Sequence, residues 1–387
     1  MTASSPHRGP APRRRREPSL RLIAGPVAAR LIAERGLRAE DVAAVPAAAG
    51  GPKGLALLPL DRFLFAHWLP RAPRSRVLVG ASVGAWRMAA AARRDPLAAL
   101  ARLEQAYLEG QRYPERPSPT QVSAVCRAMV RELIGDDPQA ALADLAPGMR
   151  LLIVTARARR APAREDAFFA GAALANLLAR DRLAGWLERV IFDSAPAPTC
   201  AGTPADAFGT RRVALAAGNL EDALLASGSI PRVAQPVRDI AGAPPGSYWD
   251  GGLIDYHLHW DWRALEGIAL MPHFVPRVTA GWLDKFLPWR RHGLGPRDRD
   301  WLDRLVLAVP SPALLARLPG GRLPERQDFH RYGLDHDRRL RDWRRAIGEC
   351  EAMAEDLASA LERPDELPIE PLGRVARSRT GTGDRGA

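Results

Sequence analysis

The segment Gly80-Ala81-Ser82-Val83-Gly84 combines residue types and spacing that indicate nucleophilic chemistry. Its serine lies between two glycines, after a predicted buried strand, 76–79 (Arg-Val-Leu-Val), and before an alanine-rich run, 85–94, that is typical of a helix. A sharp strand-to-helix turn of this kind exposes the serine hydroxyl and points the N-terminus of the helix at it, which favours developing negative charge. Gly80 and Gly84 keep side chains out of the crowded turn, so Ser82 is the candidate nucleophile.

A second glycine-rich segment, Gly50-Gly51-Pro52-Lys53-Gly54, lies between the apolar run 42–48 and the amphipathic run 55–68. Glycines leave backbone N–H groups uncovered and a helix start adds partial positive charge, so such a loop can hold a phosphate or an oxyanion. Lysine at this position is informative, because the chain has two lysines, Lys53 and Lys285, against 54 arginines. The alternative is an ordinary Gly-Pro turn, and the spacing is not that of a Walker loop.

A third motif, Trp249-Asp250-Gly251-Gly252, places an acid before two glycines. At the end of a strand this arrangement can put the carboxylate of Asp250 into a crevice above a sheet. The same residues could also form a plain turn, since aspartate and glycine are both common in turns.

The elements around these motifs predict a parallel α/β sheet, because strand, turn and helix repeat twice within about sixty residues. Further strands are predicted at 150–155, 190–192, 213–216 and 268–270. Further helices are predicted at 27–35, 121–134, 167–178 and 220–226, the last with Asn219 as its N-cap. Between residues 340 and 361 apolar residues recur at alternating spacings of three and four, which predicts a long helix packed on the domain, with a dimer seam as the alternative.

Taken in this order, the three motifs resemble those of the patatin-like phospholipase family. The segment Ala226-Ser227-Gly228-Ser229-Ile230-Pro231 is similar to a block of small residues and proline that the family carries before its aspartate. The resemblance covers roughly residues 40–275 and implies a three-layer α/β/α fold with a mainly parallel central sheet. It also implies a catalytic dyad of Ser82 and Asp250, an elbow shaped by Gly80 and Gly84, and an oxyanion hole at Gly50, Gly51, Lys53 and Gly54.

The chain departs from the family at the start of the glycine-rich loop. The family loop usually begins Asp-Gly-Gly-Gly, whereas Ala48-Ala49-Gly50-Gly51 stands here. Pro52 has no N–H and cannot donate to an oxyanion. The departure bears on the identity of the donors more than on the dyad.

The expected function is that of a serine acyl hydrolase that cleaves a lipid or another ester without metal or cofactor. One alternative is an α/β-hydrolase with a Ser–Asp–His triad, because His257, His259 and His273 all follow Asp250. Another is a non-catalytic patatin-fold protein that binds lipid. Two alternating histidines without acidic companions are more often core or surface residues than metal ligands.

The predicted organisation is a disordered basic tail at 1–22, a hydrolase domain at 23–275, a partly helical extension at 276–365 and a disordered tail at 366–387. The three cysteines and the absence of a secretory h-region favour the cytoplasm, and no apolar run of about 18 residues predicts a membrane span. A net charge of +12 and the aromatic and cationic segment 282–291 suggest peripheral contact with an anionic membrane. No nucleic-acid-binding pattern occurs, so no nucleic-acid partner is expected.

Overall fold

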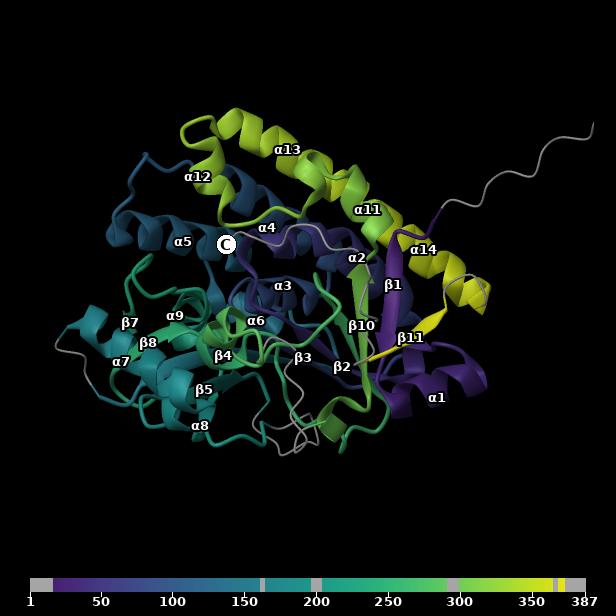
Figure 1. Cartoon of the computed structure of the whole chain (residues 1–387), viewed down its shortest axis with the longest axis horizontal. Helices are drawn as coiled ribbons and strands as arrows, with labels where there is room; N and C mark the ends of the chain where they lie inside the picture. Colours follow the sequence, from purple (N-terminus) through teal and green to yellow (C-terminus); the bar gives the residue numbers. More distant parts are fainter. Residues whose placement is uncertain (1–16, 161–163, 196–203, 291–298, 365–367, 373–387) are drawn as a thin grey trace, which may run out of the picture.

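The computed structural model describes residues 17–160, 164–195, 204–290, 299–364 and 368–372 (Figure 1). Within these ranges the strands are β1 (Leu20–Ala24), β2 (Val42–Ala47), β3 (Arg76–Ala81), β4 (Met149–Ala158), β5 (Leu187–Asp193), β6 (Thr210–Ala214), β7 (Val237–Arg238), β8 (Ser247–Asp250), β9 (Ile268–Pro272), β10 (Leu305–Pro310) and β11 (Ile369–Pro371). The α-helices are α1 (Pro26–Arg35), α2 (Leu58–Arg62), α3 (Val83–Ala91), α4 (Pro96–Gly110), α5 (Pro119–Ile134), α6 (Pro138–Ala143), α7 (Glu165–Leu178), α8 (Arg180–Leu183), α9 (Ala217–Ser227), α10 (Gly252–Asp255), α11 (Pro312–Arg317), α12 (Asp328–Tyr332), α13 (His336–Glu349) and α14 (Glu351–Glu362).

The described strands form one mixed sheet in the order β11-β1-β10-β9-β2-β3-β4-β5-β6, with β8 paired to β4 and β7 paired to β8. Its centre is parallel from β10 through β9, β2 and β3 to β4. The pairs β1–β10, β4–β5 and β4–β8 are antiparallel. Helices flank this sheet (Figure 1), which confirms the predicted α/β class with a mostly parallel centre and is consistent with three layers.

The register along β4 brings two distant parts of the chain together. Ala81, the last residue of β3, pairs with Val154, while Asp250, the last residue of β8, pairs with Thr155. Because β3 is parallel to β4 and β8 is antiparallel to it, the two strands approach the same point of β4 from opposite directions. The residues that follow Ala81 and Asp250 therefore meet at one place.

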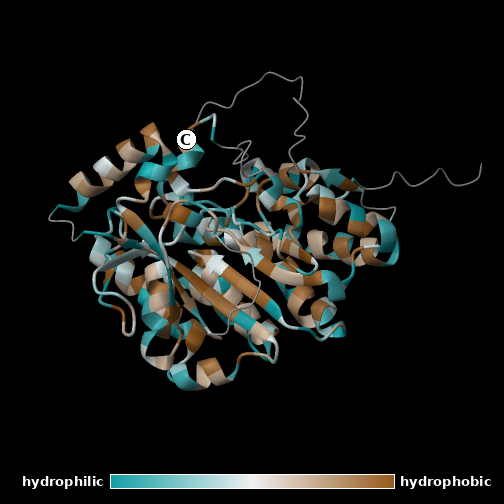
Figure 2. Ribbon diagram, turned by 90° about the horizontal axis from the view of Figure 1, so that it is seen from below, coloured by the Kyte–Doolittle hydropathy of each residue, from teal (hydrophilic) through white to brown (hydrophobic). Residues whose placement is uncertain are grey.

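The sheet forms the centre of the hydrophobic core. Every residue of β2, β5 and β10 is buried, as is typical of strands covered on both faces. Figure 2 shows these central strands as largely hydrophobic, with flanking helices that alternate hydrophobic and hydrophilic residues. A smaller second cluster includes Phe168 of α7, Trp249 of β8 and Ile254 of α10, whereas Tyr248 of β8 belongs to the main core, so β8 packs against both clusters.

The ends of the chain contribute to the sheet beyond the predicted boundaries. Strand β1 begins at Leu20, inside the segment predicted as a basic tail, and β11 lies inside the segment predicted as the C-terminal tail. Strand β10 comes from the predicted extension and pairs with both β1 and β9. Strands β1 and β11 are short, and their partners lie far away in the sequence or, for β11, at its other end. Strand β10 is a continuous apolar run that is not predicted as a strand. The remaining residues of both tails lie outside the described ranges.

Two predicted helices are interrupted. The run predicted as one helix at 55–68 consists of a 3₁₀ helix, η2 (Gly51–Leu57), then α2, then a π-helical turn, η3 (Phe63–Trp68). Pro59 lacks an N–H and cannot donate to the carbonyl four residues earlier, so an α-helix cannot run through from residue 55. The long C-terminal helix is likewise divided into α13 and α14 at Cys350.

The apolar face of α13 and α14 packs on the domain, as predicted, because Leu340, Trp343, Cys350 and Leu357 are all buried within the single chain.

Asn219 is not the N-cap of α9. It occupies the third helical position, where its Oδ1 accepts the N–H of Ala216 at 2.9 Å. Among the helices that the structure describes, none has the length and apolar character needed to cross a bilayer.

Candidate active site

Ser82 occupies a sharp turn between β3 and α3. Its backbone has φ 58° and ψ −136°, a conformation that non-glycine residues rarely adopt and that costs energy unless the surroundings enforce it. The flanking glycines allow the turn, since a Cβ on Gly80 would lie 2.4 Å from the nitrogen of Ala85 and one on Gly84 would lie 2.1 Å from the carbonyl oxygen of Ala47. Both contacts are too short for any side chain, so the turn has the geometry of a nucleophile elbow.

The Ser82 hydroxyl lies close enough to the carboxylate of Asp250 to lower the pKa of that carboxylate by hydrogen bonding. Asp250 Oδ1 also accepts the backbone N–H of Gly252 at 2.7 Å, which fixes the carboxylate beside the turn. Both side chains are buried, each with 5% relative exposure. The convergence of β3 and β8 on β4 thus places a candidate nucleophile and a candidate base in direct contact.

The pKa of Asp250 is raised to about 6, mainly because burial disfavours the charged carboxylate. The hydrogen bonds from Ser82 and from the N–H of Gly252 act in the opposite direction, and so does the positive charge of Arg326. The result is a carboxylate that is ionised at neutral pH but is more basic than an exposed aspartate. That combination suits a general base.

Two serines before β8 hold both members of this pair. Ser227 Oγ accepts the N–H of Ser82 at 2.9 Å and donates to the carbonyl of Val154 at 2.7 Å. The carbonyl of Ser229 accepts the N–H of Asp250 at 2.8 Å. Both serines are buried. The sequence does not predict this positioning role, because both serines belong to a run of small residues before Pro231 and carry no further signal.

The glycine-rich loop follows β2 and opens η2 beside the elbow. A Cβ on Gly54 would lie 3.0 Å from a methyl of Val83, the residue after Ser82. Ala49, just before the loop, donates its N–H to the carbonyl of Tyr256 at 2.9 Å. The first N–H groups of a helix have no acceptor within it, so those of Gly50 and Gly51 are available at this end of η2. Lys53 and Gly54 belong to the same turn.

A buried ion pair fixes the loop against the elbow helix. Arg87 of α3 and Asp61 of α2 form two hydrogen bonds of 2.7 and 2.8 Å, and both side chains are almost completely buried. Burial raises the pKa of Asp61, while the charge and hydrogen bonds of Arg87 lower it. The pair joins the helices that follow the two predicted motifs, so it sets the position of the loop relative to Ser82.

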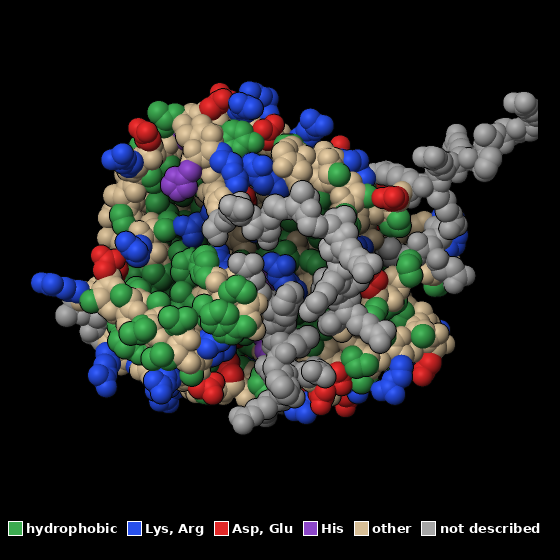
Figure 3. All heavy atoms as spheres, viewed as in Figure 1, with side chains coloured by type: hydrophobic (Ala, Val, Ile, Leu, Met, Phe, Trp, Pro, Cys, Tyr) green, Lys and Arg blue, Asp and Glu red, His purple; other side chains and the backbone are tan. Residues whose placement is uncertain are grey.

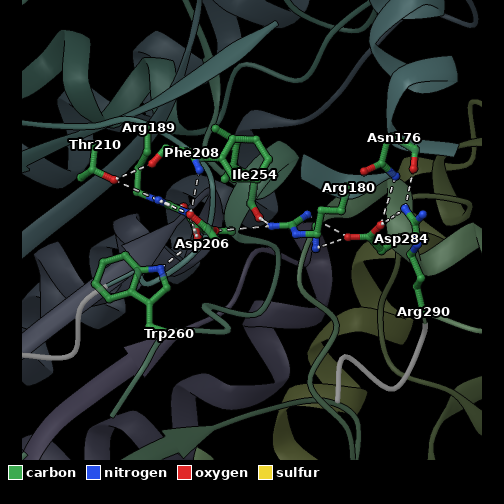
Figure 4. A network of polar contacts seen from close by, with 12 residues as sticks. Asn176, Arg180, Arg189, Asp206, Phe208, Thr210, Ile254, Trp260, Asp284 and Arg290 are labelled. Atoms are coloured by element: carbon green, nitrogen blue, oxygen red, sulfur yellow. Dashed lines mark hydrogen bonds and ion pairs between the residues drawn. The ribbon is translucent and has the colours of Figure 1, made fainter. Parts of the chain in front are cut away.

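A second polar network holds α10, the helix that begins two residues after Asp250 (Figure 4). Arg189 of β5 binds both Asp255, at 2.5 and 3.0 Å, and Asp206, at 2.7 and 3.1 Å. Arg180 donates to the carbonyl of Ile254 at 2.7 Å and to Asp284 at 2.8 Å. The polar network therefore anchors α10, which directly follows the candidate base Asp250.

The three histidines considered for a triad do not stand between Ser82 and Asp250. Nδ1 of His257 accepts the N–H of Thr279 at 3.0 Å, and Nε2 of His273 lies 3.1 Å from the carbonyl of Arg277. Burial lowers the pKa of His273 to about 3 and that of His259 to about 4, and it holds the pKa of His257 well below 6.5. They are neutral core residues at pH 7.

A cavity lined in part by residues of α5 lies apart from the candidate pair. The described residues contain no group of three or more His, Cys, Asp or Glu side chains that could hold a metal ion. A cavity of about 590 Å³ opens elsewhere and is lined by residues that include Arg127, Arg232 and Gln235. Neither member of the Ser82–Asp250 pair lines that cavity, so the pair itself, and not cavity volume, identifies the candidate site.

Comparison with protein-family models and with curated proteins does not assign the chain to a family. No protein-family model matches the chain, and no curated protein matches it significantly.

Proposed function

We propose that the protein is a serine acyl hydrolase in which Ser82 is the nucleophile and Asp250 is the general base. The observation that carries the proposal is the convergence of β3 and β8 on β4, which places the two side chains together at a strained elbow, where Ser82 acts on the pKa of Asp250. A nucleophile and a base in contact, with the base held by further hydrogen bonds, are the signature of an activated nucleophile. We also propose the finer fold assignment, a patatin-like arrangement, on the order of the three motifs along β2, β3 and β8.

In the proposed mechanism, Asp250 accepts the hydroxyl proton as the oxygen of Ser82 attacks an ester carbonyl. N–H groups of the loop Gly50, Gly51, Lys53 and Gly54 stabilise the tetrahedral oxyanion, a contribution of roughly 3–4 kcal/mol per donor in comparable sites. The intermediate collapses, and the departing alcohol takes the proton from Asp250. Water then attacks the acyl–serine ester, gives its proton to Asp250 and releases the acid, and the proton returns to Ser82.

A lipid substrate and peripheral membrane contact are part of the proposal. Exposed apolar side chains gather on one face, which we call the α7 face: Leu174, Leu177 and Leu178 of α7 with Phe286 and Trp289. Arg290 joins the two segments by donating to the carbonyl of Asn176. Figure 3 shows hydrophobic side chains on this side of the molecule, in the lower left of the view. With a net charge of +12, such a surface suits an anionic bilayer.

Covalent labelling tests the proposal. A fluorophosphonate probe reacts with an activated serine, so wild type is expected to be labelled and Ser82→Ala is not. Asp250→Asn should label at least about a hundredfold more slowly, because it removes general-base assistance. Ser359→Ala, which removes a serine hydroxyl from α14, is the matched control and should label as wild type. Equal labelling of wild type and Ser82→Ala would refute the assignment, and a protein that is never labelled would favour the non-catalytic, lipid-binding alternative.

A further inference from the structure

The cavity of about 590 Å³ lies on the side of the molecule where α5, α7, α9 and β7 come together (Figure 1). Residues 232–238, which we call the wall segment and which end in β7, supply most of its lining. Arg127, Glu165 and Asp222 line it from the three helices. Small-molecule sites in proteins have volumes of about 300–1,000 Å³, so the cavity is large enough for a small ligand.

Both ends of the wall segment lead to the candidate active site. The chain enters it from Ser227 and Ser229, which bind the N–H groups of Ser82 and Asp250. It leaves through β7, which pairs antiparallel with β8, the strand that ends at Asp250. The cavity is therefore continuous along the backbone with the groups that hold the nucleophile and the base, and a ligand that moves or fixes the wall segment acts on both.

The backbone at the two ends of the wall segment is strained. Arg232 has φ 66° and Asp239, the residue after β7, has φ 50°. Left-handed conformations of this kind cost about 1–3 kcal/mol each outside glycine and are found at ligand clamps and switch regions. Between them Gln235 ties the segment to α5, through its N–H to Ser123 Oγ at 2.8 Å and its Nε2 to Thr120 Oγ1 at 3.0 Å. Few contacts of this kind hold the segment, which makes it an element that a ligand can bias.

Most of the charge around the cavity is balanced within the chain. Arg127 lies 3.1 Å from the carboxylate of Asp222 and also pairs with Glu221. Arg232 lies 3.1 Å from the carboxylate of Asp166. These pairs leave two charged residues of the lining to consider, one from α7 and one from β7.

Glu165 and Arg238 are these two residues, and they do not pair with each other. The charge of Arg238 lowers the pKa of Glu165 against the larger, opposite effect of burial, so the two side chains interact across the cavity. Neither forms an ion pair with any residue that the structure describes, and Arg238 donates only to Ser247 Oγ, at 3.0 Å. A guanidinium can bind a carboxylate with two parallel hydrogen bonds, and a carboxylate can accept from an ammonium group. The cavity thus presents one group for each end of a zwitterion.

We propose that the cavity binds a small zwitterion of the α-amino acid type, with its carboxylate on Arg238 and its ammonium group on Glu165, and that binding raises turnover at Ser82. A ligand that bridges the two side chains ties β7 to α7 and fixes the wall segment, and with it the supports of Ser82 and Asp250. The binding rests on the cavity alone, whereas the effect on turnover rests on the proposed function.

Calorimetry on the full chain tests the binding. The probes are L-glutamine, whose polar side chain suits the polar lining, N-acetyl-L-glutamine, which lacks the ammonium group, and L-glutaminamide, which lacks the carboxylate. L-Glutamine is expected to bind at least about tenfold more tightly than either derivative, and Glu165→Gln and Arg238→Gln should each remove that advantage. Arg30→Gln, an exposed charge on α1, is the matched control and should retain it. Equal affinity for the three probes, or no binding of L-glutamine, would overturn the zwitterion site.

The hydrolysis of p-nitrophenyl butyrate, a neutral soluble ester, tests the coupling. Saturating L-glutamine is expected to raise kcat by about fivefold or more in wild type and in Arg30→Gln, and to have no effect in Glu165→Gln. Binding of L-glutamine to a wild-type protein that hydrolyses no ester would count against the proposed reaction and not against the site. A kcat that stays constant while calorimetry shows the ligand bound would overturn the coupling through the wall segment.

Discussion

At the scale of single residues, the pKa of the buried Asp250 carboxylate depends on a small number of neighbouring groups. Asp250 is shielded from water, and one hydroxyl, one backbone N–H and the charge of Arg326 oppose the effect of burial. Because these contributions act on one titration, the pH dependence of turnover reports on them directly. Two predictions belong at this scale.

The first prediction concerns the pKa of Asp250. Since the base must be ionised, kcat/KM for a neutral ester should fall as the pH drops through about 6, approaching tenfold per pH unit. Arg326 lowers this pKa, so Arg326→Gln should move the acid limb to higher pH, whereas Arg30→Gln should not. A pH–rate profile of the three proteins provides the test. A limb that stays in place in Arg326→Gln would show that this arginine does not act on the base.

The second prediction concerns Ser227. Replacing it by alanine removes the acceptor of the Ser82 N–H and the donor to Val154. A buried N–H left unsatisfied costs about 1–3 kcal/mol, so urea unfolding should show a loss of that size in the free energy of unfolding. Because the strained backbone of Ser82 loses a restraint, kcat should fall with little change in KM. Ser359→Ala, on α14, should leave kcat unchanged, and an unaltered kcat in Ser227→Ala would reject the positioning role.

The sequence predicts the chemistry of Ser82 and Asp250 because their motifs are local. Close backbone contacts leave no room for a side chain at Gly80, Gly84 and Gly251, so glycines stand next to each functional residue in the sequence and make the motif recognisable. Ser227 and Arg326 have no such signal. A serine that accepts a backbone N–H looks like any serine in a small-residue run, and Arg326 is one of 54 arginines, in a segment predicted to be a separate extension.

At the scale of secondary-structure elements, the site is an outcome of strand register and of the contacts between α2 and α3. The apolar runs predict β2, β3, β4, β5 and β9 because buried parallel strands are continuously hydrophobic. Strands β1, β7, β8 and β11, which are short, are not predicted, and neither is β10, although Leu305–Pro310 is a continuous apolar run. The antiparallel pairing of β8 with β4 is not predicted either, because nothing in residues 247–250 indicates that Asp250 pairs with Thr155. This pairing places Asp250 next to Ser82, because Ala81 pairs with the neighbouring residue of β4, Val154.

An element-scale prediction follows from the Arg87–Asp61 pair. Removing one partner leaves a buried charge without compensation, so Asp61→Leu or Arg87→Met should each lower the free energy of unfolding by about 3–5 kcal/mol. Replacing both, by Asp61→Leu with Arg87→Met, should recover much of that loss because no charge stays buried. Urea unfolding of the four proteins gives a double-mutant cycle. Additive losses in the double variant would show that the two side chains do not act as a pair.

The α7 face gives a second element-scale prediction. Leu174, Leu177 and Leu178 lie three and four residues apart and so share one side of the helix, where each is about half exposed or more. Leu178→Ser with Trp289→Ser should reduce binding to anionic vesicles in flotation, while hydrolysis of a soluble ester stays at the wild-type rate. Leu334→Ser removes an exposed leucine elsewhere and is the control. Vesicle binding that is unchanged in the double variant would remove the α7 face from the proposal.

At the scale of the whole molecule, the chain folds around one sheet whose strands come from both ends of the sequence. Strand β10 links β1 to β9, so residues beyond 300 complete the core that the first 25 residues begin. Arg326 and α13 belong to this returning part of the chain. The segment predicted to be an extension therefore contributes a central strand to the sheet.

The buried histidines make the stability of the whole molecule sensitive to acid. His257, His259 and His273 have folded pKa values below the unfolded value of 6.5, so the unfolded chain binds more protons. Their stability contribution is complete above pH 6.5 and is lost as the pH falls toward 4. Asp61 and Asp250, whose pKa values are raised, act in the opposite direction and offset part of the loss.

Between pH 7 and pH 5 each buried histidine should therefore cost about 2 kcal/mol, and the free energy of unfolding should fall by several kcal/mol in urea titrations. His273→Phe should reduce this fall by about one histidine's share, because an apolar ring replaces the group that must accept a proton. The exposed His67 is the matched control, and His67→Gln should leave the pH dependence as in wild type. A stability that does not change between these pH values would mean that the histidines are hydrated in solution, and it would weaken the assignment of His257 and His273 to a closed core behind the loop.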